Sequence, residues 1–237
     1  MTEPELIALE LAGLQADCAA AGLPFDLAWL PRLAALCHLV AQEARHQNLV
    51  GDPSPAGVRT HIAEALTTAA VVAGAGVTPR VVADIGAGAG LEALVLALAW
   101  PTATITAIEP RRLRAEFIVA AVAALGLPNV EFVRATLHGA VPHRLWPKGL
   151  DVATARAVWP APEWMVKAAP LLAEQGVAIV HGRGPAEALG AQLVLLGAVA
   201  AVADVPGPHG HAVAAVRLGP AVAHAQRIPA RGQPAGA

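Results

Sequence analysis

Hydrophobic residues follow one spacing in the first third of this chain and another in the rest. Up to Gly76 they recur every three or four positions, which predicts helices over residues 5–21, 27–48 and 59–73. Glycines and prolines separate these helices. Beyond Gly76, short apolar runs alternate with helical patterns, and such alternation is typical of a parallel sheet with helices on both faces.

The second part of the chain predicts strands and helices in alternation, closed by a hairpin. Strands are expected over 80–85, 103–109, 130–135, 151–155 and 177–181. Helices are expected over 91–100, 111–125, 162–172 and 186–196. Two further runs, 199–205 and 212–218, flank a glycine-proline turn and predict a hairpin. The predicted fold class is therefore α/β, with a mostly parallel sheet and an antiparallel C-terminal edge strand.

The same pattern divides the chain into three parts. Residues 1–76 form a helical N-terminal extension, and residues 77–220 form the α/β domain. The last part, 221–237, is rich in proline, glycine and alanine, which predicts a disordered tail.

Composition narrows the functional classes. With 16 Lys and Arg against 18 Asp and Glu, the net charge is -2, so the whole chain lacks the strongly basic character of many nucleic-acid-binding proteins. Alanine is the largest contributor to the hydrophobic content of 56%, and the apolar runs are too short to predict a membrane span. An acidic start and two cysteines, Cys18 and Cys37, fit a reduced cytoplasmic setting without a clustered metal-ligand set. We expect a cytoplasmic monomer that binds no metal.

A glycine-rich loop carries the first candidate chemistry. The stretch Asp84-Ile85-Gly86-Ala87-Gly88-Ala89-Gly90-Leu91 follows an apolar strand and opens a helix. Glycines are needed where φ turns positive or where a ligand lies against the backbone. The spacing differs from the G-x-G-x-x-G fingerprint of dinucleotide sites, and no Walker lysine follows, so a phosphate cradle is excluded. The loop looks like motif I of the class I S-adenosylmethionine methyltransferases.

Two acids at the ends of neighbouring predicted strands support a nucleoside cofactor. Asp84 lies two residues before the first glycine, where a carboxylate can meet the ammonium group of a methionine moiety. Glu109 ends the next strand, where a carboxylate can accept both hydroxyls of a ribose. An NAD enzyme would place an acid similarly, so Glu109 supports an adenosine cofactor without choosing one.

Further short stretches point to one protein family. They are Gln47-Asn48-Leu49, His61-Ile62 with Glu64, Glu109 with Arg114 and Phe117, Pro128-Asn129-Val130, and Asp151 to Val158. Together with the glycine loop, they resemble the glucose-inhibited division protein B (GidB, RsmG) family, methyltransferases that modify N7 of a guanine in small-subunit ribosomal RNA. The resemblance runs from about Gln47 to Leu218.

This resemblance implies a fold, a cofactor, a partner and a set of site residues. The fold is the Rossmann-like fold of class I methyltransferases, the cofactor is S-adenosylmethionine, and the partner is small-subunit rRNA or a pre-assembled small subunit. The implied cofactor-binding residues are Asp84, Gly86, Ala87, Gly88, Gly90, Leu91, Glu109, Thr136 and Leu137. Arg156, after the fourth strand, is implied as the catalytic residue, and Arg111, Arg112, His181 and Arg183 are the candidates for substrate binding.

The chain departs from the family pattern around the expected pocket. Glu92-Ala93 replaces the family's Pro-Gly, Thr136-Leu137-His138 replaces an acidic stretch, and His181-Gly182-Arg183 replaces Lys-Gly. Two alternatives to the rRNA methyltransferase therefore stay open. One is a methyltransferase of the same fold with a small-molecule substrate, and the other is a degenerate relative that binds the cofactor or acts as a scaffold without catalysis.

The chemistry of N7 methylation limits what the residues must do. Guanine N7 carries a lone pair and no proton, so no general base is required, and the protein must align donor and acceptor and exclude water. Arg156 can grip a phosphate, or it can form an ion pair with Asp84, Asp151 or Glu163. Arg111, Arg112 and Arg114 form either a basic lip for RNA or a solvated helix face.

Overall fold

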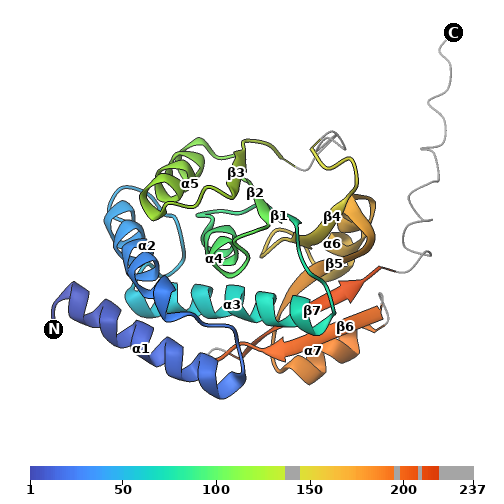
Figure 1. Ribbon diagram of the computed structural model, residues 1–237, viewed down its shortest axis with the longest axis horizontal. Helices are drawn as coiled ribbons and strands as arrows, with labels where there is room; N and C mark the ends of the chain where they lie inside the picture. The colour runs from blue at the N-terminus through green and yellow to red at the C-terminus, as the bar shows by residue number, and fades with distance from the viewer. Residues whose placement is uncertain (137–144, 195–197, 208–209, 219–237) are drawn as a thin grey trace, which may run out of the picture.

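The computed structural model describes residues 1–136, 145–194, 198–207 and 210–218 (Figure 1). The N-terminal part is helical, with α1 Glu3–Ala21, the 3-10 turn η1 Leu27–Trp29, α2 Leu30–Glu43 and α3 Pro55–Gly74. The strands are β1 Val81–Ile85, β2 Thr104–Ile108, β3 Val130–Val133, β4 Leu150–Thr154, β5 Leu172–Arg183, β6 Ala198–Asp204 and β7 His211–Arg217. The helices between them are α4 Leu91–Ala99, α5 Arg112–Leu125, α6 Ala161–Ala168, the turn η2 Ala169–Leu171, and α7 Ala186–Leu193.

Local sequence signals start and stop the N-terminal helices. The Ser54 hydroxyl accepts the Gly57 N–H at 3.1 Å, which caps the start of α3. Gly22 ends α1 in the left-handed conformation, with φ 66°. The helix expected over 27–48 is shorter than predicted, because α2 ends at Glu43 and the chain then turns toward the sheet.

The strands form one seven-stranded sheet in the order β3-β2-β1-β4-β5-β7-β6. β1 to β5 pair in parallel, whereas β7 is antiparallel to both β5 and β6. The predicted α/β fold with an antiparallel hairpin at one edge is confirmed. β7 lies between β5 and β6, so β6 is the edge strand. In the register, Asp84 of β1 pairs with Ala107 of β2 and Thr154 of β4, so the carboxyl ends of the three central strands lie together.

Successive residues of each strand pack into different cores on the two faces of the sheet. Val82 and Ile179 join the core beneath α1 to α5, whereas Ala83 and Val180 join the core beneath α6 and α7. Figure 1 shows α3 lying between α1 and α4 and running toward β7. The N-terminal helices therefore share a core with the sheet, and the predicted boundary at residue 76 does not separate two cores.

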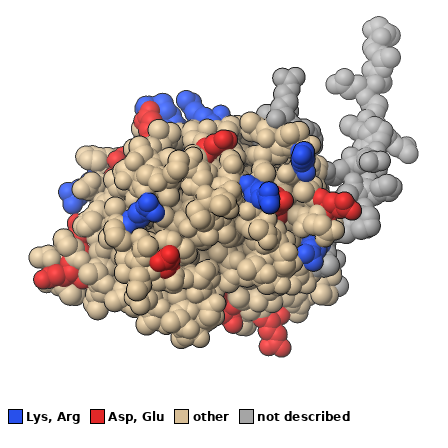
Figure 2. Space-filling view, viewed as in Figure 1, with Lys and Arg blue, Asp and Glu red and all other residues tan. Residues whose placement is uncertain are grey.

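Charge is sparse on the face that carries the N-terminal helices. Figure 2 shows Lys, Arg, Asp and Glu scattered over a mostly uncharged surface, with several basic side chains at the upper edge near α5. No helix in the described part of the chain is long and apolar enough to cross a membrane. The predicted tail, 221–237, lies outside the described residues.

Candidate functional site

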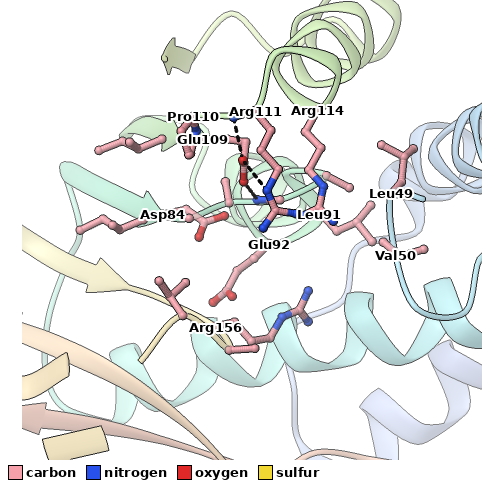
Figure 3. Close-up of a pocket in the computed structure, with 18 of the residues that line it drawn as sticks. Leu49, Val50, Asp84, Leu91, Glu92, Glu109, Pro110, Arg111, Arg114 and Arg156 are labelled. Atoms are coloured by element: carbon pink, nitrogen blue, oxygen red, sulfur yellow. Dashed lines mark hydrogen bonds and ion pairs between the residues drawn. The ribbon is translucent and has the colours of Figure 1, made fainter. Parts of the chain in front are cut away.

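A cavity of about 580 Å³ opens at the carboxyl ends of β1, β2 and β4 (Figure 3). Of the predicted site residues, it is lined by Asp84, Gly86, Ala87, Gly88, Leu91, Glu109, Arg111, Thr136 and Arg156. In an open α/β sheet, ligands bind in a crevice at the carboxyl ends of the parallel strands. The cavity lies at this edge, where the sequence predicted the site. Leu137, another predicted cofactor residue, lies outside the described residues.

The glycine loop is held against β2 and against the loop after β4. The backbone N–H groups of Gly86 and Ala87 both donate to the Ile108 carbonyl at 2.9 Å. Gly86 has φ 74°, and a Cβ added there would lie 2.5 Å from Val158 Cγ2. Glycine is therefore required by both the turn and the close approach of the loop that carries Arg156.

Gly90 packs the loop and does not line the cavity. It precedes α4 with φ 72°, and an added Cβ would lie 2.8 Å from Ile118 Cγ1 in α5. The contact between Gly90 and the cofactor stays a prediction, and close packing between the loop and α5 requires glycine at this position. This is the packing role that the third glycine has in dinucleotide fingerprints.

Glu109 lies on the cavity wall as predicted and already holds two backbone groups. Its Oε2 accepts the Gly88 N–H at 3.0 Å, and its Oε1 accepts the Arg111 N–H at 2.9 Å. The carboxylate therefore ties the glycine loop to the start of α5. Each of its oxygens can accept a further hydrogen bond, so it remains able to receive the two hydroxyls of a ribose.

Asp84 is buried at the end of β1, and one of its carboxylate oxygens, Oδ2, has no hydrogen-bond partner among the described residues. Burial, together with the charge of Glu92, raises the pKa of Asp84 to about 7. Arg156, His181 and the Ala93 N–H act in the opposite direction. The cavity therefore contains a carboxyl group that changes charge near neutral pH.

Glu92, at the start of α4, is a second buried acid on the cavity wall. Its Oε1 accepts the hydroxyls of Thr68 at 3.1 Å and Thr154 at 3.0 Å and lies 3.3 Å from His181 Nε2. Burial opposes ionisation of Glu92, but His181 and these hydrogen bonds lower its pKa. Figure 3 shows Asp84 and Glu92 extending into the same part of the cavity.

The structure places His181 beneath the cavity wall, away from the position expected for substrate binding. Its ring is packed against Glu92, and its Nε2 lies 3.2 Å from the Thr154 hydroxyl. His181 does lie in β5, as predicted, but its side chain supports the second acid and does not line the cavity.

Arg156 lines the cavity and is held by α3. Its Nη1 donates to Glu64 Oε2 and lies 2.7 Å from His61 Nδ1. Glu64 also contacts His211 Nδ1 of β7 at 2.7 Å. Burial opposes the charge of Glu64, yet the hydrogen bond from His61 and the charge of Arg156 hold its pKa well below the usual range.

The ion-pair partner of Arg156 differs from the three considered from the sequence. Asp151 accepts the backbone N–H groups of Arg80 and Val81 at the opposite end of β1. Glu163 pairs with Lys167 at 3.4 Å. Arg156 instead pairs with Glu64, which lies far from it in the sequence.

The predicted basic residues separate into two groups. Arg111 and Arg114, two of the three residues of the predicted basic lip, lie on the cavity wall. The pKa of Arg114 is lowered by burial and by the charge of Arg111, and its Nη2 donates to the Asn48 carbonyl at 3.3 Å. Arg112 instead pairs with Glu116 on the exposed side of α5 at 2.6 Å. The exposed Arg183 at the end of β5 does not line the cavity.

Comparison with known proteins decides the family. The model of the GidB family, rRNA small subunit methyltransferase G, matches residues 30–190. The chain belongs to the GidB family. The predicted family and fold class are confirmed, and the predicted enzyme class, a methyltransferase that uses S-adenosylmethionine, is the class of this family.

Relatives with the same name are found in several bacteria. The ribosomal RNA small subunit methyltransferase G of Leifsonia xyli is 39% identical over 54% of this chain and 53% of its own length. That of Chromohalobacter salexigens is 34% identical over 70% of this chain and 75% of its own length. Among solved structures, the precorrin-6Y C5,15-methyltransferase of Geobacter metallireducens is 18% identical, with a TM-score of 0.48, over 64% of this chain and 87% of that chain.

Several wall residues were missing from the predicted GidB site. They are Leu49, Val50, Gly51, His61, Glu92, Pro110, Ala135 and Val158. A charged residue within the apolar pattern of α4 was the available signal for Glu92. The segment around Leu49 carried a weaker signal, since only its glycine and proline marked the end of a helix.

Proposed function

We propose that this protein transfers a methyl group from S-adenosylmethionine to N7 of a guanine in small-subunit rRNA. The observation that carries the proposal is the pair of acids, Asp84 and Glu109, at the tips of adjacent strands on the wall of one cavity beside a glycine loop. Membership of the GidB family supports the substrate class.

The cavity residues fit the cofactor. The unpartnered Asp84 oxygen suits a ligand ammonium, because a buried carboxylate oxygen without a donor is costly unless something binds it. Glu109 would receive the ribose hydroxyls. Gly86 and Gly88 leave the loop without side chains where the nucleoside would lie, and Thr136 lines the wall beyond β3. When bound, the cofactor supplies an electrophilic methyl group on a sulfonium.

The chain's own residues contribute alignment and charge placement. Guanine N7 has no proton to lose, so the chain needs no general base and instead must orient the base and exclude water. We assign Arg156 to an RNA phosphate, since a cation next to N7 would oppose the positive charge that develops on the base. Glu64 fixes the guanidinium through Nη1, which leaves Nη2 and Nε for the phosphate.

The partner in this proposal is the rRNA, free or within a pre-assembled small subunit in the cytoplasm. Arg111 and Arg114 on the cavity wall would contact backbone phosphates next to the target base. The target guanine must be unstacked to reach the cavity, as is usual in sequence-specific recognition of RNA.

The decisive experiment compares N7-methylguanine in the rRNA of cells with and without the gene. Loss of one N7-methylguanine that the wild-type gene restores, and that the Glu109→Ala variant does not, would support the proposal. An unchanged methylation map would refute the rRNA substrate.

A small-molecule substrate is the second candidate, favoured by the net charge of -2 and by the altered residues at the cavity edge. Calorimetry with S-adenosylhomocysteine separates the readings. Binding without any change in rRNA methylation would favour the small molecule, and no binding at millimolar ligand would exclude both enzymes and indicate a degenerate relative.

A further inference from the structure

Two carboxylate oxygens in the cavity region are buried without a hydrogen-bond partner among the described residues: Asp84 Oδ2 and Glu92 Oε2. Both acids line the same cavity, and Figure 3 shows both pointing into it. A buried polar atom left without a partner is destabilising by about 1 to 3 kcal/mol, and more when it is charged. Two such atoms at one place suggest a site that a donor occupies.

The two carboxylate oxygens of Glu92 differ in their contacts: Oε1 has several partners, and Oε2 has none among the described residues. The Thr68 and Thr154 hydroxyls and His181 Nε2 all approach Oε1. That oxygen ties α4 to α3, β4 and β5, and this network gives Glu92 a structural role. Oε2 takes no part in the network and is therefore the oxygen that a ligand could use.

The surroundings of the two acids are mixed in charge. Asp84 on β1 faces Glu92 on α4, Arg156 after β4, His181 on β5 and the backbone N–H of Ala93. Among the described residues, no group of three or more His, Cys, Asp and Glu side chains is placed to hold a metal ion. A single organic cation with several N–H donors matches two adjacent carboxylates better.

We infer that Asp84 and Glu92 together form the subsite for the α-ammonium group of the cofactor's methionine end, and that the two acids share one proton before the cofactor binds. The inference rests on the proposed function and adds Glu92, which stands where the family usually has proline. The ammonium donates one hydrogen bond to Asp84 Oδ2 and another to Glu92 Oε2. The two partnerless oxygens are thereby satisfied.

The proton balance follows from the charges. Before binding, one acid is a neutral carboxyl and the other a carboxylate, so the pair carries a charge of about -1 near pH 6, because burial and Glu92 raise the pKa of Asp84 to about 7. The cationic ammonium enters, the shared proton leaves to water, and both acids become carboxylates. Binding of the methionine end should therefore release a proton below pH 7.

The test uses two ligands that share the nucleoside and the thioether and differ at the methionine end. S-adenosylhomocysteine carries the α-ammonium and α-carboxylate groups there, and methylthioadenosine carries neither. Each is titrated calorimetrically into the wild type at pH 6 and pH 8, in two buffers of different ionisation enthalpy, which yields the number of protons released. Protons exchanged when the nucleoside part binds would appear equally with both ligands.

For the wild type we expect S-adenosylhomocysteine to release about 0.9 proton at pH 6 and about 0.1 at pH 8, from a pKa of about 7. Its affinity should be about tenfold weaker at pH 6 than at pH 8. Methylthioadenosine should show neither effect. At pH 8, Glu92→Gln should weaken S-adenosylhomocysteine by roughly tenfold to hundredfold and methylthioadenosine by less than about twofold.

The matched control is Glu116→Gln, which removes a carboxylate on the exposed side of α5. It should leave both affinities and the proton count unchanged. Equal weakening of both ligands by Glu92→Gln would reduce Glu92 to its structural role, and zero proton release by the wild type at pH 6 would overturn the shared proton. The wild-type proton count needs no variant, so misfolding of Glu92→Gln cannot hide that result. If the wild type binds neither ligand, the proposed function itself fails.

Discussion

The substitution Asp84→Asn should stabilise the protein, and more so as the pH rises. The pKa of Asp84 is raised from 3.8 to about 7, mainly by burial and then by the charge of Glu92. The native state thus keeps a proton that the unfolded chain loses above about pH 4, so the wild type becomes less stable as the pH rises from about 4 to 7. An uncharged amide does not titrate, and its NH₂ can donate to the partnerless Glu92 oxygen.

The size of the expected change in stability follows from the shift in the pKa of Asp84. A pKa raised from 3.8 to about 7 corresponds to about 4 kcal/mol of lost stability at high pH, of which about 3 kcal/mol is lost between pH 5 and pH 8. For a chain of this size, that is a relative gain of about 6 to 12 °C in the melting temperature of the variant.

Denaturant unfolding of the wild type, Asp84→Asn and the exposed control Glu116→Gln at pH 5, 6.5 and 8 measures the effect. The difference between Asp84→Asn and the wild type should widen with pH, whereas the control should follow the wild type. Parallel curves for all three proteins would show that Asp84 is ionised throughout and that its burial is compensated.

Three further substitutions test other parts of the site. Glu109→Gln should lower S-adenosylhomocysteine affinity by at least about tenfold in calorimetry, because one acceptor and the charge are lost; a change below threefold would mean that the ribose is held elsewhere. Gly90→Ala should lower the free energy of unfolding by about 2 to 4 kcal/mol, from the positive φ and the contact with Ile118, and an unchanged denaturation midpoint would contradict that packing. Arg156→Ala should destabilise by about 1 to 3 kcal/mol at pH 7, since Glu64 keeps its charge with fewer partners. Because the fold holds the pKa of Glu64 well below its usual range, this difference should persist near pH 4 and be lost only at lower pH, where the native carboxylate takes up a proton in chemical denaturation; a difference that disappears between pH 7 and pH 5 would show that Glu64 is not the partner that matters.

The sequence alone predicted the fold and the position of the two acids at the ends of adjacent strands. Alternating strands and helices predicted the sheet, and Asp84 and Glu109 were found because each ends a strand whose neighbour is parallel. The packing of Gly90 against Ile118 was not predicted, because a spacing pattern shows that a glycine is needed but not whether a ligand or a helix approaches it.

The rest of the site depends on contacts between distant segments. His211 reaches Glu64 from 147 positions away, through the pairing of β7 with β5 and the packing of α3. Neither the hydrophobic period of α3 nor the hydrophobic pattern of β7 predicts the contact between His211 and Glu64. The pairing of Arg156 with Glu64 was missed for the same reason.

The placement of α3 against β7 bears on how the protein is made. Translation delivers α3 early and β7 last among the described strands, yet the two lie against each other in the finished molecule. A nascent chain that has exposed everything up to β5 still leaves uncovered the part of α3 that packs against β6 and β7, and such apolar surfaces are prone to aggregate. We expect the pocket to mature only after the ribosome has released the final strand.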